Sequence, residues 1–255
     1  VELNYHIEPP GADFIFNIHP AQTSCQVVSA EQLSLNQAIP VDLQTDPASR
    51  NRYLRLQALP GDLRVNYSAT VDLQHHRADP LQLKEVPISK LPLDVAAYIY
   101  PSRYCESDRL IPLASKQFGQ LDQGYSRVQA IMHWVQRQIT YTSNTSDSRT
   151  AAVETLIDQV GVCRDFAHLM IALCRAVNIP ARFATGTDYG ADPSIGPPDF
   201  HAYVEAYVGD RWYIFHPWGT GIPAGFVRIG TGRDAADVAF ATIFGGVRST
   251  RPPRV

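Results

Sequence analysis

The sequence predicts an α+β protein, with an antiparallel β-sandwich in residues 1–100 and a mixed α+β domain in residues 101–255. Two observations lead to this prediction. In about the first 100 residues apolar and polar positions alternate, whereas after residue 122 apolar residues recur with the 3.6-residue period of helices. The helical stretches come first and further strands follow them, which is the order typical of α+β domains.

The clearest strand of the first half runs from Leu63 to Leu73, where every second residue is apolar and the residues between them are polar. Pro60-Gly61 marks a turn directly before it, and "FIFNIHP" (14–20) is predicted to be another strand. Since no helical pattern competes, several such strands favour a β-sandwich. His75 and His76, at the end of this region, are expected to face solvent rather than bind a metal.

Residues 88–122 read as irregular chain with short helices, so we place the domain boundary here, at residue 100. Three helical stripes follow, over 128–139, 152–160 and 163–177. Gly161 is expected to end the second stripe, and Asn178-Ile179-Pro180 ends the third because proline cannot continue a helix.

Strands are predicted over 182–185, 202–208 and 211–215. The two-residue loop Gly209-Asp210 would pair Val208 with Arg211 and, counting back, Tyr203 with the residue at 216. This register puts His201 and His216 on one face of the hairpin, as diagonal neighbours.

The composition excludes several classes of protein. The chain has 255 residues, a net charge of −3, no long basic run and no apolar run that could span a membrane, so neither nucleic acid nor a membrane is an expected partner. The four cysteines lack the spacing of a metal site or a disulfide scaffold, which favours a reducing, cytoplasmic location. A bridge between Cys25 and Cys105 stays open as an alternative.

Cys163 is the candidate nucleophile because it stands where the third helix begins. The first N–H groups of a helix lack internal partners and stabilise a thiolate, the reactive form of cysteine. His201, at the start of a strand, is the candidate proton acceptor. His168 lies on another side of the helix and is expected to be packed. A small packed residue is the alternative interpretation of Cys163.

Three segments resemble the bacterial transglutaminase-like family: "GVCRDFAHLMIALCRAVNIPARFATG" (161–186), "HAYVEAYV" (201–208) and "RWYIFHPWG" (211–219). "GTGRDAADV" (230–238) is similar to the end of the family's core. The resemblance implies a papain-like α+β core with a Cys-His-Asp triad, preceded by a β domain. It implies Cys163 as nucleophile and His201 as general base.

The chain departs from the family pattern at His216, which occupies the position of the family's aspartate. A histidine can accept the N–H of the base but offers no negative charge. The alternatives are a Cys163-His201-His216 triad, a weakened enzyme, or a binding protein on an enzyme scaffold. Asp188 and Asp199 precede His201 and are candidates to supply the missing charge.

The other nearby carboxylates are assigned elsewhere. Glu205 shares the face of His201 but lies four residues along the strand. Asp165, in the first turn of the third helix, is expected to interact with the helix dipole rather than take part in catalysis.

The expected activity is hydrolysis of peptide or protein amides through a thioester on Cys163, without a cofactor or metal. Transglutaminase activity and a non-catalytic interaction protein are the alternatives. If His216 orients His201 as a neutral acceptor, reactivity should fall near the ordinary histidine pKa of about 6.5, where His216 would take up a proton.

Overall fold

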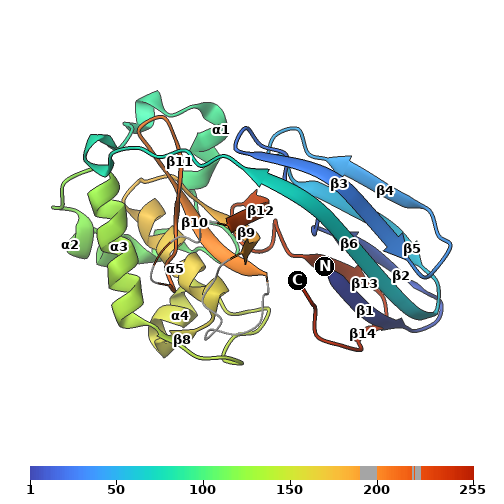
Figure 1. Cartoon of the computed structure of the whole chain (residues 1–255). Helices are drawn as coiled ribbons and strands as arrows, with labels where there is room; N and C mark the ends of the chain where they lie inside the picture. Colours follow the sequence, from blue (N-terminus) through green and yellow to red (C-terminus); the bar gives the residue numbers. More distant parts are fainter. Residues whose placement is uncertain (190–199, 220, 222–224) are drawn as a thin grey trace.

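The computed structural model describes residues 1–189, 200–219, 221 and 225–255. A β-sandwich lies beside a second domain, which consists of helices and an antiparallel sheet of its own (Figure 1). The two chain termini lie close together, and Glu2 forms a β-bridge with Arg254.

The sandwich consists of two four-stranded antiparallel sheets, with the orders β14-β1-β6-β3 and β13-β2-β5-β4. The strands are β1 (Glu2–Ile7), β2 (Ala12–Phe16), β3 (Gln26–Leu35), β4 (Val41–Thr45), β5 (Arg52–Ala58), β6 (Gly61–Leu73), β13 (Ala241–Phe244) and β14 (Val247–Ser249).

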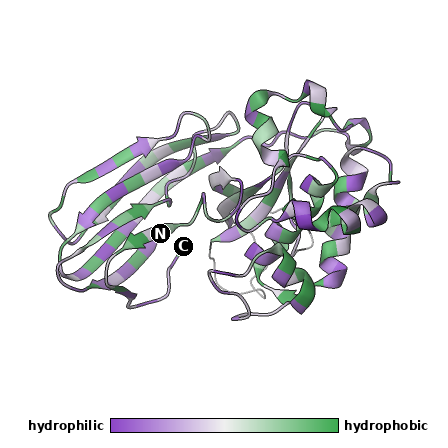
Figure 2. Cartoon of the chain, turned by 180° about the vertical axis from the view of Figure 1, so that it is seen from behind, coloured by the Kyte–Doolittle hydropathy of each residue, from purple (hydrophilic) through white to green (hydrophobic). Residues whose placement is uncertain are grey.

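Alternating side chains form the core of the sandwich, as the sequence predicts. Leu63, Val65 and Tyr67 of β6 are buried, and the stacked rings of Phe14 and Phe16 from β2 lie 5.1 Å apart. Beyond Tyr67 the inward residues of β6 are only half-buried, because this end of the strand extends past the core. The alternation of hydrophobic and hydrophilic residues along the strands is visible in Figure 2.

The structure divides the chain differently from the predicted domains 1–100 and 101–255, and the difference concerns both ends of the second domain. β13 pairs with β2 and β14 pairs with β1, so the last strands of the chain complete the sandwich. The segment after β6 packs against the helices instead, since Leu83 lies in their core and Glu85 pairs with Arg127. The period of the apolar residues indicates that a segment is a strand, but it does not identify the sheet that the strand joins.

Short helices connect the sandwich to the second domain. They are η1 (Pro80–Gln82), η2 (Ile88–Lys90), α1 (Leu93–Ala96) and η3 (Ala97–Ile99). The longer helices are α2 (Ser107–Phe118), α3 (Tyr125–Gln138), α4 (Ala152–Asp158) and α5 (Cys163–Ala176). Among the described residues, no helix is long and apolar enough to cross a membrane.

The predicted helical stripes correspond to α3, α4 and α5, with two differences. The irregular segment that we predicted contains the 12-residue helix α2, despite Pro112 inside it. α4 ends at Asp158 rather than at Gly161, because Gln159 adopts a left-handed conformation. Val160–Gly161 then forms β8, which pairs in parallel with β7 (Thr140–Tyr141).

The sheet of the second domain has the order β11-β10-β9-β12 and is antiparallel. Its strands are β9 (Ala181–Tyr189), β10 (His201–Val208), β11 (Arg211–Phe215) and β12 (Gly225–Gly232). The predicted pairing of Val208 with Arg211 is confirmed. β12 was not predicted, because its glycines interrupt the alternation of apolar residues.

α5 is the centre of the second domain. Every residue from Asp165 to Ala176 is buried, and one face of β10 packs against the helix through four small apolar side chains. These side chains are Ala202, Val204, Ala206 and Val208. A helix that is enclosed on all sides must satisfy its polar side chains internally.

Arg175 meets this requirement at the end of α5. Its guanidinium donates to the carbonyls of Ala181 (2.9 Å), Tyr100 (3.1 Å) and Arg233 (2.5 Å), and to the Ser102 hydroxyl (3.0 Å). These acceptors belong to the start of β9, the chain before α2 and the chain after β12. One buried side chain therefore connects three segments to the end of the central helix.

We predict that Arg175→Met destabilises the protein by at least about 3 kcal/mol, because it leaves several buried acceptors without a donor. Urea denaturation followed by far-UV circular dichroism measures the change. Arg137→Met, at an exposed arginine in the last turn of α3, is the matched control and should change stability by less than about 0.5 kcal/mol. Equal effects of the two substitutions would contradict the role of Arg175.

Candidate active site

Cys163 is the first residue of α5, and its position depends on Asp165. Val162 is extended, and its N–H donates to the buried Asp165 carboxylate at 2.8 Å, which stabilises the start of the helix. Ser146 donates to the other oxygen of Asp165 at 3.0 Å. A Cβ on Gly161 would lie 2.7 Å from that of Asp165, so glycine is needed for this close approach. Asp165 therefore has the structural role that the sequence predicts.

Cys163 also differs from the other cysteines in its surroundings. It is half-buried at the positive end of α5, whereas Cys25 is exposed and Cys105 and Cys174 are fully buried. Burial raises the pKa of Cys105 to about 12 and also raises the pKa of Cys174. All four cysteines are thiols, so the Cys25–Cys105 bridge that the sequence left open is not formed.

His201 is the first residue of β10, opposite Gly186 of β9, and its ring is partly exposed. The indole ring of Trp218 lies 4.9 Å from the His201 ring. Trp218 in turn donates from Nε1 to the carbonyl of Ala202 at 3.0 Å, which fixes the indole beside the start of β10.

His216 follows the end of β11 and is 7% exposed. The Val204–Phe215 pair continues to Tyr203 opposite His216, and these two rings lie 4.9 Å apart, in agreement with the predicted register. Nδ1 of His216 lies 2.5 Å from the carbonyl oxygen of Gly221, so Nδ1 carries the proton. A Cβ on Gly219 would overlap the His216 ring, so this close approach also requires glycine.

The predicted hydrogen bond between His201 and His216 is not formed. Nε2 of His216 is buried and has no hydrogen-bond partner among the described residues. Trp218 contacts both rings instead, at 4.9 Å from His201 and 4.5 Å from His216. His216 thus lies in the neighbourhood that we predicted, but the two imidazoles are not paired directly.

Asp188 of β9 brings a negative charge to the same place. Its carboxylate accepts a hydrogen bond from the buried hydroxyl of Tyr203, and its charge favours protonation of His216. Burial and Asp188 raise the pKa of Tyr203, and a negative charge on Cys163 raises it further. Charges on Cys163 and Asp188 therefore both act on Tyr203, and Asp188 also acts on His216.

The remaining candidates do not join this group. Asp199 lies outside the described residues. Glu205 is buried between Arg182 and Arg228; burial opposes its ionisation, yet the two guanidinium groups hold the pKa of its carboxyl below the ordinary value. His168 is buried and accepts a hydrogen bond from the Ala235 N–H, so it is a packed residue as predicted.

The pKa of His216 corrects one expectation. Burial lowers this pKa and the positive charge of His201 lowers it further, whereas the Gly221 carbonyl and Asp188 oppose the shift with a smaller effect. His216 is therefore protonated at a lower pH than the sequence suggested.

A cavity of about 780 Å³ opens beside His216 and Trp218. Its other walls come from α3, Tyr141 and Phe166, and they are mainly aromatic and apolar with a few amide and imidazole groups. Gln136 of α3 donates to the carbonyl of Gly219 at 2.9 Å and so connects this wall to the segment after β11.

Sequence reasoning missed three residues of this site. Trp218 follows the end of a strand, where no periodic signal exists. Tyr203 could have been found, since it shares a strand face with His201. Gly219 is recognised only from the close approach of the His216 ring.

The chain matches two family models. Residues 112–217 match the transglutaminase-like superfamily, and residues 1–94 match the bacterial transglutaminase N-terminal domain. The crystal structure of a "putative cysteine protease" from Cytophaga hutchinsonii is 41% identical, with a TM-score of 0.91. That similarity covers 98% of this chain and 86% of the Cytophaga chain.

Curated relatives are more distant. An uncharacterized protein of Mycobacterium leprae is 26% identical over 55% of this chain and 52% of its own length. One of Mycobacterium tuberculosis is 33% identical over 39% of this chain and 35% of its own length. The chain thus spans about half, or less, of the length of these relatives.

The lowered pKa of His216 predicts a pH dependence of stability. The unfolded chain takes up the proton first, so this contribution to stability is complete above the unfolded pKa of about 6.5 and is lost as the pH falls through the folded pKa. Urea denaturation between pH 7.5 and pH 5, values that bracket the ordinary pKa, should show a steeper loss in wild type than in His216→Gln. His133→Gln, at an exposed histidine, should behave as wild type. Parallel curves for all three proteins would contradict the prediction.

Proposed function

Since the chain belongs to the bacterial transglutaminase-like family, we propose that it hydrolyses peptide or protein amides with Cys163 as nucleophile and His201 as general base. The observation that carries the proposal is the placement of Cys163. It is a half-buried thiol at the N-terminus of a helix that is enclosed from Asp165 onward, and its charge acts on Tyr203, whose hydroxyl bonds to Asp188.

The reaction begins with attack of the Cys163 thiolate on the amide carbonyl carbon. The negative oxygen that forms is stabilised by backbone N–H groups at the start of α5, which have no acceptors within the helix. The imidazolium of His201 donates its proton to the nitrogen as the C–N bond breaks, and the amine leaves. A thioester between Cys163 and the acyl group remains.

Water completes the cycle. His201, now neutral, takes a proton from water as its oxygen attacks the thioester, and the carboxylic acid product leaves as the Cys163 thiolate is restored. If an amine attacks instead of water, the same intermediate gives transamidation. We favour hydrolysis because water is always available and the sequence has no feature that selects a lysine side chain.

His216 is assigned to the third position as a neutral residue. It is held by the Gly221 carbonyl and contacts Trp218, which also contacts His201, so its role is to position the base rather than to supply charge. The carboxylate of Asp188 partly offsets the lowering of the His216 pKa by burial. The aromatic cavity beside His216 and Trp218 is suited to an apolar side chain of the substrate.

We predict that iodoacetamide at pH 6 modifies Cys163 at least about tenfold faster than Cys25, because the helix N-terminus lowers the pKa of Cys163. Peptide mapping by mass spectrometry measures both rates in one sample, and exposed Cys25 is the internal control. Cys105 and Cys174 should remain unmodified while the protein is folded. Equal rates at Cys25 and Cys163 would refute the thiolate assignment.

For His216 we predict opposite effects of two substitutions on hydrolysis of a peptide ester. His216→Ala should lower kcat at least about tenfold, whereas His216→Asp should raise kcat and extend activity to lower pH, because a carboxylate stabilises the His201 imidazolium. Gly219→Ala should act like His216→Ala, since its methyl group displaces the ring.

Circular dichroism of each variant serves as the folding control, and an added primary amine distinguishes transamidation from hydrolysis. If His216→Ala and His216→Asp leave the pH profile of kcat unchanged, His216 only packs. If wild type shows neither reaction, and Cys163 is no more reactive than Cys25, the chain is a binding protein on an enzyme scaffold.

A further inference from the structure

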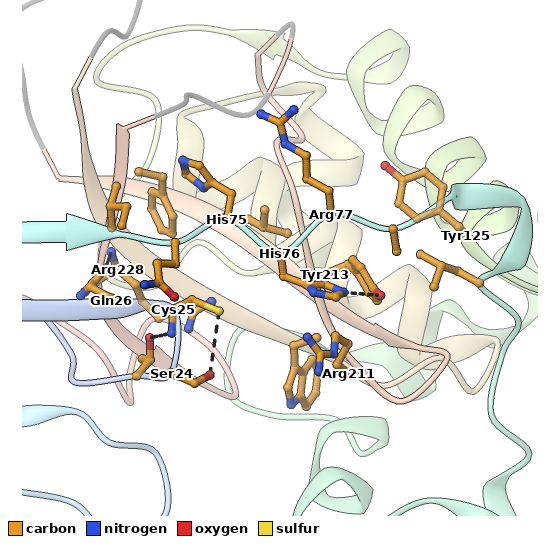
Figure 3. Close-up of a pocket in the computed structure, with 18 of the residues that line it drawn as sticks. Ser24, Cys25, Gln26, His75, His76, Arg77, Tyr125, Arg211, Tyr213 and Arg228 are labelled. Carbon is orange, nitrogen blue, oxygen red and sulfur yellow. Dashed lines mark hydrogen bonds between the residues drawn. The ribbon is translucent and has the colours of Figure 1, made fainter.

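A second cavity, of about 690 Å³, lies between the sandwich and the sheet of the second domain, on the face of that sheet that is turned away from α5. Figure 3 shows the parts of the chain that form most of it: the start of β3 with Cys25 and Gln26, the segment after β6 with His75, His76 and Arg77, strands β11 and β12, and Tyr125 of α3. Arg182 of β9 also lines it. Neither Cys163 nor His201 lines it, although Tyr125 and Ile214 border both this cavity and the one beside His216.

The described lining of this cavity is strongly basic. It contains Arg77, Arg182, Arg211 and Arg228, together with His75 and His76, and no aspartate or glutamate. The whole chain has a net charge of −3, so this collection of positive charge is a local feature and not a reflection of the composition. Clustered guanidinium groups repel one another unless an anion compensates them.

Carboxylates outside the lining compensate only part of this charge. Glu205, buried beneath Arg182 and Arg228, is shared between them. Asp210 lies 3.8 Å from Arg211 and is largely exposed, which makes it a weak partner. Arg77 has no carboxylate partner among the described residues. Four guanidinium groups therefore meet two carboxylates, and two positive charges remain in excess.

Two contacts hold parts of this basic surface in place. The guanidinium of Arg182 stacks on Trp212, with its carbon 4.2 Å from the ring centre, and donates from Nε to Glu205 at 2.7 Å. The backbone N–H of Arg228 donates to Oε1 of Gln26 at 2.9 Å, and Nε2 of Gln26 donates to the backbone carbonyl of Arg228 at 2.8 Å. The sandwich and β12 are thereby joined at the edge of the cavity. Arg182 keeps N–H donors that Glu205 does not use.

We propose that this interdomain cavity binds a small polyanion through phosphate or carboxylate oxygens. Its volume is in the range of small-molecule sites, and arginine forks match the geometry of both oxyanion groups. Because Arg77 comes from the segment after β6 and Arg211 from β11, a bound anion bridges the connection from the sandwich to the sheet that carries His201.

Isothermal titration calorimetry of the full chain at low ionic strength tests the proposal, with pyrophosphate and citrate as separate probes. Wild type should bind at least one probe at a single site, and added salt should weaken the binding. Binding of pyrophosphate alone identifies a phosphate ligand, binding of citrate alone a carboxylate ligand, and binding of both a general oxyanion site. Absence of binding by both probes up to about 5 mM would overturn the proposal.

The test variant is the double substitution Arg77→Ala/Arg211→Ala, and its matched control is Arg149→Ala. Arg149 is exposed, pairs with nearby Asp147 as Arg211 does with Asp210, and lies outside the cavity. The double variant should lose at least about tenfold in affinity while Arg149→Ala binds as wild type. We leave Arg182 and Arg228 unchanged, because their removal would strand the buried Glu205 carboxylate.

Cys163→Ala separates this proposal from the proposed function. It should abolish hydrolysis and bind the probes as wild type does. If Cys163→Ala loses probe binding, or if the double variant and Arg149→Ala bind equally, the anion lies elsewhere and the cavity is not its site. Thermal unfolding without probe confirms that each variant is folded.

Discussion

The enclosure of α5 is the constraint on which the second domain depends. A helix that is buried from Asp165 to Ala176 has no solvent there to satisfy its polar groups, so most of them need a partner within the protein. Asp165 bonds the start of the helix and Arg175 bonds three chain segments at its end. Cys163 and the neighbouring Arg164, in the first turn, reach the edge of this core. The same bonds that stabilise the fold therefore determine where the thiol lies.

The proposed site differs from a Cys-His-Asp arrangement in how charge is distributed. His216 is buried, holds its proton on Nδ1 toward Gly221, and has a lowered pKa. The negative charge comes from the neighbouring strand, where Asp188 is bonded to Tyr203. Trp218 contacts both histidine rings. Position and charge, which one aspartate would provide together, are divided here among several side chains.

The contact between the two domains includes directional hydrogen bonds and involves both ends of the chain. The last strands return to the sandwich, while Gln26 and Asn51 of the sandwich bond to Arg228 and Thr231 of β12. Such bonds are directional, so they favour one orientation of the sheet relative to the sandwich. The basic cavity lies at this junction, and its ligand would contact both domains and the segment that joins them.

The sequence by itself determined which segments are helices and which are strands, and it placed the candidate nucleophile. Alternation gave β6, the 3.6 period gave α3 and α5, and the short loop at Gly209-Asp210 gave the hairpin register, because each depends on contacts between residues that are near in the chain. Cys163 at a helix start and His201 at a strand start followed from the same local patterns. Only the tertiary structure decided that β13 and β14 join the sandwich, that His216 points to Gly221, and that four arginines meet between the domains. These depend on contacts between distant segments, for which no periodicity in the sequence carries a signal.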